Sequence, residues 1–583
     1  MTRIAWREWG DEAFDLAKQS DRPVLLFLFA SWCRFCREME QNVFEDAKIA
    51  VVVGERYVPV RVDKDKRPEI NQRYNLGGWP TLAFLTPGGD LISGGSSLSV
   101  DEASALIEKV PDYFKNHREQ IDVDIEKIVA SQEKIDRERL SRKGEFSAAI
   151  VDKVATAILE AFDRKHGGFG EGQKFPHPEA IDFSIIYFAK TRDPAFQEIV
   201  MKTLTAMQEG RLHDDVAGGF FRYCAIRDWQ QPHTEKLLES QAGLLRNYLE
   251  AYQMSERADF RKVARKILSY LETHLFDPQT GAWFGSQDAD DAYYSLTERE
   301  RLDRKEPRVE PTCYTPSVAM TASALLKAAS VFRDDALKQR ALGALNFLLE
   351  RCYSAGRGMY HYFDGKRHIL GLLVDQIYTA RALLHAIQYT GDNVYLPVVE
   401  DLITTIIKKQ SATHGGFYDI AEDDAKFGSL RRRQTSLLEN GVMAEVLIRT
   451  YFMTRERNYM ELAERTLKAF AADYQLYGYF TASYARAVEL FFHPPVCVVL
   501  VGSRAQPAFQ RLLTVAQEIF IPSKLILSID PAEESDLLER HQFPKAAQPT
   551  CYLCLQHSCV AEVSDPERLP EEMHKAERGR AAK

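Results

Sequence analysis

Residues 24–36 read Val-Leu-Leu-Phe-Leu-Phe-Ala-Ser-Trp-Cys-Arg-Phe-Cys, and this stretch decides the fold of the first part of the chain. The apolar run up to Ala30 is typical of a central strand that is buried on both faces. A helical pattern begins at Cys33 and places Cys36 one turn further along. Free backbone N–H groups and the helix dipole stabilise a thiolate at a helix start. The sequence therefore predicts Cys33 as a nucleophile and Cys36 as the resolving thiol.

Elements on either side of this stretch complete an α/β unit of residues 1–113. A short helix is expected at 11–19, and further strands are expected at 57–62 and 82–85. The alternation of strands and helices over about 110 residues is typical of one α/β domain of ordinary size.

The dithiol resembles the site of thioredoxins, because Trp32 precedes Cys33 and Gly78-Trp79-Pro80-Thr81 matches the loop that carries their cis-proline. In that family the proline faces the dithiol and helps to hold substrate peptides. The resemblance implies a thioredoxin fold, with Pro80 in the catalytic site beside Cys33 and Cys36, and with Trp32 in contact with substrate.

Two positions depart from the thioredoxin pattern. Thioredoxins carry a buried acid in the strand before the dithiol, and Phe27 occupies that position here. The usual Gly-Pro pair between the cysteines is replaced by Arg34-Phe35. A positive Arg34 favours the Cys33 thiolate, whereas the missing acid is expected to slow thiolate regeneration.

The character of the chain changes after residue 113. Residues 114–145 are rich in charged side chains and predict an exposed helical linker. Residues 146–490 contain about twelve amphipathic helical segments, which predicts a ring of six antiparallel hairpins. Short and long connections alternate, so nearly all the long loops are expected on one rim, where sites are usually built.

The long loops resemble one another, which indicates an internal repeat. Glycines that can end a helix are followed by an aromatic residue, at intervals of roughly 50–60 residues. The repeated segments are 166–169, 218–220, 281–284, 356–360 and 414–417.

The order of motifs resembles one family, the spermatogenesis-associated, thioredoxin-domain-containing proteins and their bacterial relatives. The resemblance implies an (α/α)6 toroid similar to N-acylglucosamine 2-epimerases and six-hairpin glycosidases. The motifs that carry it are Asp63 to Pro68, Gly77 to Pro80, Gly167-Gly168-Phe169, Lys174-Phe175-Pro176, Gly218-Gly219-Phe220, Arg222-Tyr223, Pro232-His233-x-Glu235-Lys236, Asp288-Ala289-Asp290, Cys554 and Cys559.

The sequence departs from this family at three places. Thr234 stands where an aromatic residue is usual, and Arg34-Phe35 replaces the usual His-Trp between the cysteines. The loop after Asp290 has little of the usual glycine and acidic run. The family's own biochemical activity is poorly defined, so the resemblance implies an architecture more than a reaction.

Candidate substrate-binding side chains gather on the long-loop rim of the expected toroid. They are Lys174, Arg222, Tyr223, Trp229, His233, Glu235, Trp283, Asp288 and Asp290. Aromatic faces with carboxylates suit a sugar.

Three roles are open for these rim residues. Glu235 with Asp288 or Asp290 would supply the carboxyl pair of a glycosidase. An epimerase needs acid and base groups on opposite faces of a sugar, with His233, or less strongly His414, as candidates. Alternatively, the same residues form a polar network that ties loops together, with Asp288 capping a turn and His233 bonded to Glu235.

The end of the chain is expected to hold a small α/β region at 491–565 and a charged, frayed tail at 566–583. Cys551-x-x-Cys554-x-x-His557-x-Cys559 offers zinc-type ligands. Its tight spacing on a strand favours buried thiols or a disulfide instead. We therefore predict neither a metal nor a cofactor.

Composition and charge narrow the classes of function that the chain can have. The net charge of −9 is spread along the chain, which argues against a nucleic-acid surface. Nine cysteines without framework spacing fit a reducing compartment, and no secretory signal or membrane-spanning run is evident, so we expect a cytoplasmic protein without a membrane partner. Three functions remain: a thiol–disulfide oxidoreductase with a protein disulfide client, a protein that binds or acts on a small sugar-like ligand, and a non-catalytic scaffold.

Overall fold

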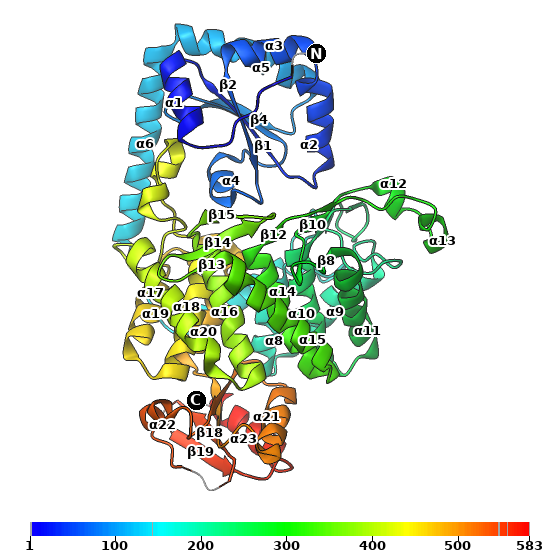
Figure 1. Cartoon of the computed structure of the whole chain (residues 1–583), viewed down its shortest axis with the longest axis vertical. Coiled ribbons are helices and arrows are strands. Elements are labelled where there is room, and N and C mark those ends of the chain that lie inside the picture. Colours follow the sequence, from blue (N-terminus) through cyan, green and yellow to red (C-terminus); the bar gives the residue numbers. More distant parts are fainter. Residues whose placement is uncertain (1–2, 143, 546–547, 557, 582–583) are drawn as a thin grey trace.

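The computed structural model describes residues 3–142, 144–545, 548–556 and 558–581. Three units follow one another along its long axis: an α/β domain, a ring of helices, and a second, smaller α/β domain (Figure 1). The predicted fold class, a thioredoxin-like domain joined to an all-helical toroid with a small α/β appendage, is confirmed.

The first domain is built on the apolar strand that the sequence indicated. Its sheet has the order β2-β1-β3-β4, in which β1 pairs parallel with β2 and antiparallel with β3. Helices α3 and α5 cover one face of the sheet, and α1 and α4 cover the other. The elements are α1 (Asp11–Ser20), β1 (Val24–Phe29), α2 (Arg34–Met39), α3 (Ala47–Arg56), β2 (Val58–Asp63), α4 (Pro68–Tyr74), β3 (Thr81–Leu85), β4 (Leu91–Ser96) and α5 (Val100–Asn116).

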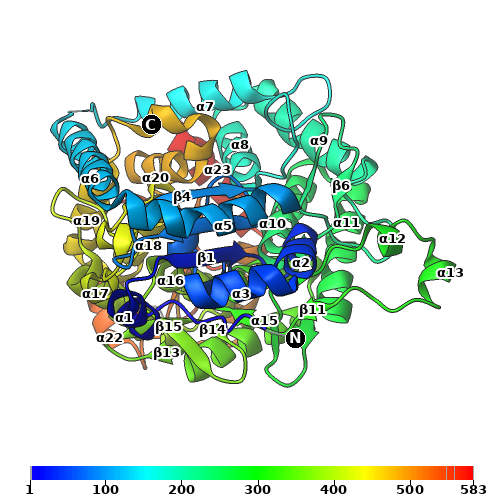
Figure 2. The same cartoon turned by 90° about the horizontal axis from the view of Figure 1, so that it is seen from above.

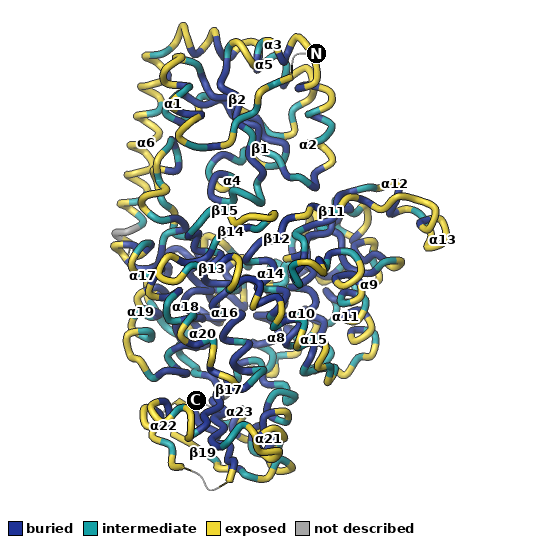
Figure 3. Tube along the Cα trace, viewed as in Figure 1, coloured by how far each residue is buried: buried dark blue, intermediate teal, exposed yellow. Residues whose placement is uncertain are grey.

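A single long helix, α6 (Arg118–Ser141), connects this domain with the ring. It is polar on nearly all sides and runs along the outside of the molecule, where Figure 3 shows it mostly exposed.

Within the described residues, six inner helices form the closed wall of the ring, each packed against the next. Figure 2 looks down on this ring with the thioredoxin-like domain in front of it. They are α8 (Pro178–Thr191), α10 (Leu238–Ser255), α14 (Thr315–Phe332), α16 (Leu373–Thr390), α18 (Leu437–Thr454) and α20 (Ala482–Phe492). The outer helices that support them are α7 (Ala149–Ala161), α9 (Pro194–Glu209), α11 (Ala258–Tyr270), α15 (Asp335–Phe347), α17 (Leu396–Gln410) and α19 (Arg457–Lys468).

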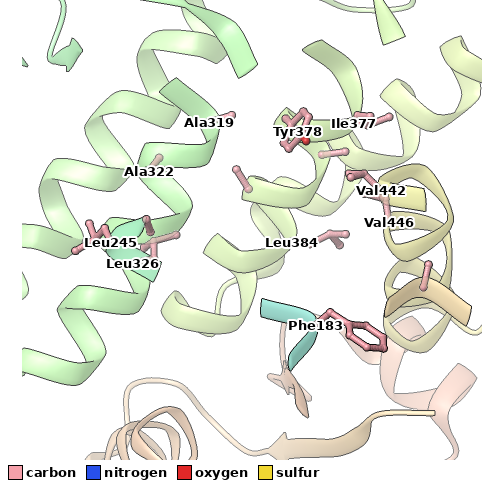
Figure 4. Packing of buried hydrophobic residues seen from close by; sticks show 14 of the residues in the cluster. Phe183, Leu245, Ala319, Ala322, Leu326, Ile377, Tyr378, Leu384, Val442 and Val446 are labelled. Atoms are coloured by element: carbon pink, nitrogen blue, oxygen red, sulfur yellow. The ribbon is translucent and has the colours of Figure 1, made fainter. Parts of the chain in front are cut away.

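Leucine, valine and alanine side chains of neighbouring inner helices interdigitate in one continuous core (Figure 4). Among the inner helices, all except α20 end at a residue in the left-handed backbone conformation. This residue turns the chain sharply into a short loop, so the short loops gather on the rim where the inner helices end. These residues are Arg192, Glu256, Arg333, Gly391 and Arg455.

The C-terminal domain repeats the topology of the first. Its sheet has the order β17-β16-β18-β19, again with one parallel and two antiparallel pairings. The described part of the chain therefore carries a sheet of thioredoxin-like topology at each end of the toroid. The elements are β16 (Val496–Val501), α21 (Pro507–Glu518), β17 (Lys524–Ile529), α22 (Ser535–His541), β18 (Thr550–Leu555), β19 (Ser558–Val563) and α23 (Leu569–Ala581).

The expectation of a loose charged tail at 566–583 is wrong for its described residues. Helix α23 buries Leu569 and Met573 against the C-terminal sheet. The Arg580 guanidinium binds Glu489 of α20, at 2.8 and 3.0 Å from its two carboxylate oxygens. Apart from the buried Arg580, most of the charged residues that suggested a frayed end lie on the outer face of this amphipathic helix.

The thioredoxin-like domain lies on the long-loop rim of the toroid (Figure 1). Leu372, Ile420 and Leu430 of the toroid belong to the same apolar cluster as the underside of its sheet. Leu237 joins the cluster that contains both cysteines of the dithiol. This docking brings the dithiol and the long loops into one place.

Candidate functional site

The dithiol lies where β1 ends and α2 begins. Cys33 is the N-cap of α2 with extended backbone angles, and its Sγ accepts the backbone N–H of Cys36 at 3.3 Å. Cys36 lies one turn into the helix and is buried. A sulfur at this position receives the partial positive charge of the helix N-terminus, as the sequence indicated.

The two thiols differ in acidity. The pKa of Cys33 is lowered, first by the hydrogen bond from the Cys36 side chain and then by the Cys36 backbone N–H, although burial opposes the shift. Burial raises the pKa of Cys36 far above the ordinary range. Cys33 is therefore the more acidic of the two thiols, and Cys36 keeps its proton until a disulfide forms on its neighbour.

The loop before β3 closes the other side of the dithiol. The Trp79–Pro80 peptide bond is cis, and the Cys33 Sγ lies 3.8 Å from the Trp79 carbonyl oxygen. Trp32 is fully buried, and its indole N–H donates to Asp65 at 2.7 Å. The structure thus brings Trp32, Cys33, Cys36 and the Pro80 loop together.

Loops of the toroid cover the dithiol from the opposite side. Three short strands, β5 (Tyr223–Cys224), β6 (Pro232–His233) and β7 (Lys236–Leu237), run beside it. The Arg222 guanidinium lies 4.7 Å from the centre of the Trp32 ring and 4.8 Å from that of Tyr223. Tyr223 stacks on His233 with ring centres 4.1 Å apart. Four of the predicted rim residues (Arg222, Tyr223, His233 and Glu235) therefore surround the dithiol.

The partly buried Arg222 and the buried Glu235 form an ion pair without a close hydrogen bond. The Arg222 Nε and Glu235 Oε2 atoms are 3.6 Å apart. Within the described part of the chain, neither of these two atoms has a hydrogen-bond partner. Both charges act on Cys33: the Glu235 carboxylate raises its pKa and the Arg222 guanidinium lowers it.

The predicted acids Asp288 and Asp290 serve the contact between the domains. Asp288 binds Arg37 of α2 at 3.0 Å and Arg308 at 3.2 Å. Asp290 caps the short helix α12 (Asp291–Tyr294) through the Tyr293 N–H. Asp288 therefore holds the second turn of the dithiol helix against the toroid, and Asp290 shapes the loop that carries it.

Three predicted residues lie away from the dithiol. The buried Lys174 ammonium binds Asp163 at 2.9 Å and the Gly170 carbonyl at 2.6 Å. Trp229 donates to the His166 carbonyl under a glycine turn. Trp283 is buried against Phe276 on the outer side of the ring. These contacts hold loops in place.

Sequence reasoning overlooked a buried acid beside the dithiol. Asp63 ends β2, in register with Phe29 of β1, and burial raises its pKa to about 7. The Asp63 carboxylate is close enough to raise the pKa of Cys36. A carboxyl group is therefore supplied by the neighbouring strand, although Phe27 occupies the position where thioredoxins carry theirs. The signal was present, because Asp63 begins the Asp-Lys-Asp-Lys-Arg-Pro motif directly after an apolar strand.

We expect Asp63→Asn to slow the resolving step by about 10²-fold at neutral pH, because asparagine cannot accept the Cys36 proton. In the wild type, resolution should accelerate as pH rises through about 7, where Asp63 loses its proton, and the variant should lose this rise. Asparagine keeps the oxygen that accepts the Asp65 N–H at 2.9 Å. Quenched-flow trapping of the mixed disulfide measures the step. An unchanged pH profile would exclude this role.

A second prediction concerns the charges around Cys33. Arg222→Gln should raise the pKa of Cys33 and Glu235→Gln should lower it, because the first removes a stabilising cation and the second a repelling anion. Alkylation by iodoacetamide, measured against pH, reports the thiolate directly. The wild-type midpoint should lie below the 9.0 of an ordinary thiol. Shifts of the same sign in both variants would contradict the arrangement.

The C-terminal cysteines are not arranged as a metal centre. Cys554 and Cys559 form a disulfide between β18 and β19, and Cys551 is a buried free thiol. His557 lies outside the described residues. Over the parts of the chain that are described, no group of three or more His, Cys, Asp or Glu side chains is placed to hold a metal ion.

Residues along the toroid axis were also missed. Glu179 and Glu239 begin the inner helices α8 and α10; both keep solvent-exposed surface, and desolvation by the surrounding helices raises the pKa of both. Arg381 of α16 is close enough to lower the pKa of Glu179, and Lys64, beside the dithiol, that of Glu239. Periodicity alone did not separate these inward positions from ordinary solvent-facing ones.

Among the described helices, none is both long and apolar enough to cross a membrane.

A family model for thioredoxin-like DsbH proteins, described as a protein of unknown function (DUF255), matches residues 1–133. Human spermatogenesis-associated protein 20 is 22% identical over 708 residues, covering 98% of this chain and 90% of that protein.

Two further proteins resemble parts of the chain. The thiol:disulfide interchange protein DsbD 1 of Pseudomonas aeruginosa is 33% identical over 104 residues, which are 17% of each chain. The solved cellobiose 2-epimerase of Spirochaeta thermophila is 15% identical with a TM-score of 0.47, covering 58% of this chain and 92% of its own. The match to the human protein, which extends over nearly the whole chain, and the family model at its start confirm the predicted resemblance to the spermatogenesis-associated, thioredoxin-domain-containing proteins.

Proposed function

We propose that the chain is a thiol–disulfide oxidoreductase in which Cys33 is the nucleophile and Cys36 the resolving thiol. The observation that carries the proposal is the pairing of the two sulfurs: Cys33 accepts the Cys36 N–H at the helix start and has a lowered pKa, while that of Cys36 is raised. This difference in acidity is what an exchange reaction requires, because one thiol must attack as a thiolate while the other stays protonated until the mixed disulfide has formed. The similarity to a thiol:disulfide interchange protein supports the same activity.

The direct test is a redox titration of the full chain in glutathione buffers of increasing oxidising strength. We expect one Cys33–Cys36 disulfide to form, detected by mass spectrometry of peptides after alkylation. Titration of Cys33 as an ordinary thiol, with no disulfide to Cys36 even in the most oxidising buffer, would refute the proposal. The protein would then be a binder that keeps a thioredoxin-like fold.

A second candidate, a toroid that binds or acts on a sugar-like ligand, is favoured by the acids on its axis. Glu179 and Glu239 retain exposed surface inside a ring of helices and face the cations Arg381 and Lys64. Paired acids with polar neighbours suit the hydroxyl groups of a sugar. A thermal-shift panel of sugars, repeated with Glu179→Gln and Glu239→Gln, tests this candidate. The absence of any shift in the wild type would remove it.

A further inference from the structure

The surface that a protein client needs is occupied by the toroid. An extended peptide that reached Cys33 would lie along the backbone of the Trp79–Pro80 loop, as peptides do when they add to an exposed edge. Here Arg222 and Leu237 fill that side, with Leu237 in the same apolar cluster as Cys33 and Trp79. Only 5% of Cys33 is exposed.

Buried polar contacts between the two domains hold the toroid loops over the dithiol. The Arg73 guanidinium of α4 donates two hydrogen bonds, of 2.7 and 3.2 Å, to the carboxylate of Asp419. Both side chains are at most 5% exposed. His361 of the toroid bridges the Asp65 carbonyl and the Asp375 carboxylate at 2.7 Å each. A protein disulfide would have to separate these groups before it met Cys33.

One edge of the covering remains open to solvent. Phe35, which lies between the two cysteines, is 51% exposed, and its ring centre is 6.4 Å from that of His233. Beside it, Arg34 binds Asp291 at 3.1 Å through side chains that are both largely exposed. The exposed residues nearest to Cys33 thus lie along this edge, and we expect a small molecule to approach the dithiol from here.

The charges next to Cys33 indicate what such a molecule carries. Arg222 and Glu235 offer a cation and an anion, and the two atoms by which they face each other, 3.6 Å apart, have no hydrogen-bond partner among the described residues. Buried polar atoms are normally satisfied, and a carboxylate for the guanidinium together with an ammonium group for the carboxylate would satisfy both. A zwitterion of the amino-acid type carries both groups.

We propose that the substrate of the dithiol is a small zwitterionic disulfide of the amino-acid type, held between Arg222 and Glu235. This inference rests on the proposed oxidoreductase function. The Cys33 thiolate attacks one substrate sulfur, the substrate S–S bond breaks, and the first thiol leaves as its thiolate. Cys36 then gives its proton to Asp63 or solvent, attacks the Cys33 Sγ and releases the second thiol. Two electrons pass from the dithiol to the substrate, and a Cys33–Cys36 disulfide remains.

The test compares single-turnover oxidation of the reduced full chain by four disulfides. Cystine carries both charges, cystamine lacks the carboxylates, dithiodipropionate lacks the ammonium groups, and insulin is a protein disulfide. Each rate is divided by the rate of the same disulfide with free dithiothreitol, which removes differences in intrinsic reactivity. We expect the normalised rate of cystine to exceed each of the other three by about tenfold or more.

Two variants separate the charges. Arg222→Gln should slow oxidation of the dithiol by cystine and dithiodipropionate relative to oxidation by cystamine. Glu235→Gln should slow oxidation by cystine and cystamine relative to oxidation by dithiodipropionate. Ratios within each variant are compared, because both substitutions also change the acidity of Cys33. Arg431→Gln removes an arginine from another part of the domain contact, where it binds Asp90 at 2.6 Å, and should leave every ratio unchanged.

The outcomes distinguish the inference about the substrate from the proposed oxidoreductase function on which it rests. Equal normalised rates for the three small disulfides would refute the inference that the substrate is a zwitterion. A faster normalised rate for insulin would refute the inference that the substrate is a small molecule. In both cases the oxidoreductase function would stand. Failure of all four disulfides to oxidise the dithiol would overturn the proposed function together with the inference.

Discussion

Replacing Cys33 with serine is expected to reduce disulfide exchange to the uncatalysed background. A serine hydroxyl cannot form a disulfide, and it remains protonated at neutral pH, so both the attack and the covalent intermediate are lost. The fold should be retained, because the hydroxyl oxygen of the new serine can accept the same Cys36 N–H that the sulfur accepts at 3.3 Å. The measurement is the rate of oxidation by cystine, followed by mass spectrometry.

The companion variant Cys36→Ser should behave differently. Its Cys33 can still attack, but nothing resolves the mixed disulfide, so one half-cystine should remain covalently attached. Cys497→Ser is the matched control, since Cys497 is a buried free thiol in β16 of the C-terminal domain, which lies at the opposite end of the molecule from the dithiol (Figure 1). Full activity in Cys33→Ser would show that another group performs the exchange.

The second large effect is expected from Asp419→Ala. Arg73 would keep its buried position but lose the carboxylate that neutralises it, and breaking a buried ion pair from one side costs about 3–5 kcal/mol. The remaining acceptors of Arg73 are backbone carbonyls, including those of Ser429 at 3.2 Å and Arg432 at 3.0 Å. We therefore expect the thioredoxin-like domain to loosen from the rim, with a lower melting temperature and faster alkylation of Cys33.

Asp90→Ala is the matched control for this prediction. Asp90 also binds an arginine across the domain contact, but its partner Arg431 is half exposed, and such pairs contribute about 0–1 kcal/mol. Calorimetry and the alkylation rate should therefore change little. If Asp419→Ala also left Cys33 as protected as in the wild type, the docking would not depend on this pair. Faster reaction with insulin in Asp419→Ala, but not in Asp90→Ala, would show that docking excludes protein clients.

The sequence by itself determined the elements and their order. The apolar run of β1, the dithiol at the start of α2 and the proline loop are local patterns, and each was predictable because burial and helix capping act on neighbouring residues. The alternation of short and long loops likewise predicted a ring with one functional rim. The residues Arg222, Tyr223, His233 and Glu235 were identified as members of one rim from their position in the chain.

Only the tertiary structure decided what these residues surround. Arg222 and Cys33 lie far apart in the sequence, and no local pattern states that the dithiol faces the rim instead of solvent. The same holds for Asp63, which reaches Cys36 through the register of two strands, and for the C-terminal sheet, whose thioredoxin-like order emerges only from its pairings. Contacts between distant segments depend on how whole surfaces fit together, and that information is spread over the chain instead of residing in any one motif.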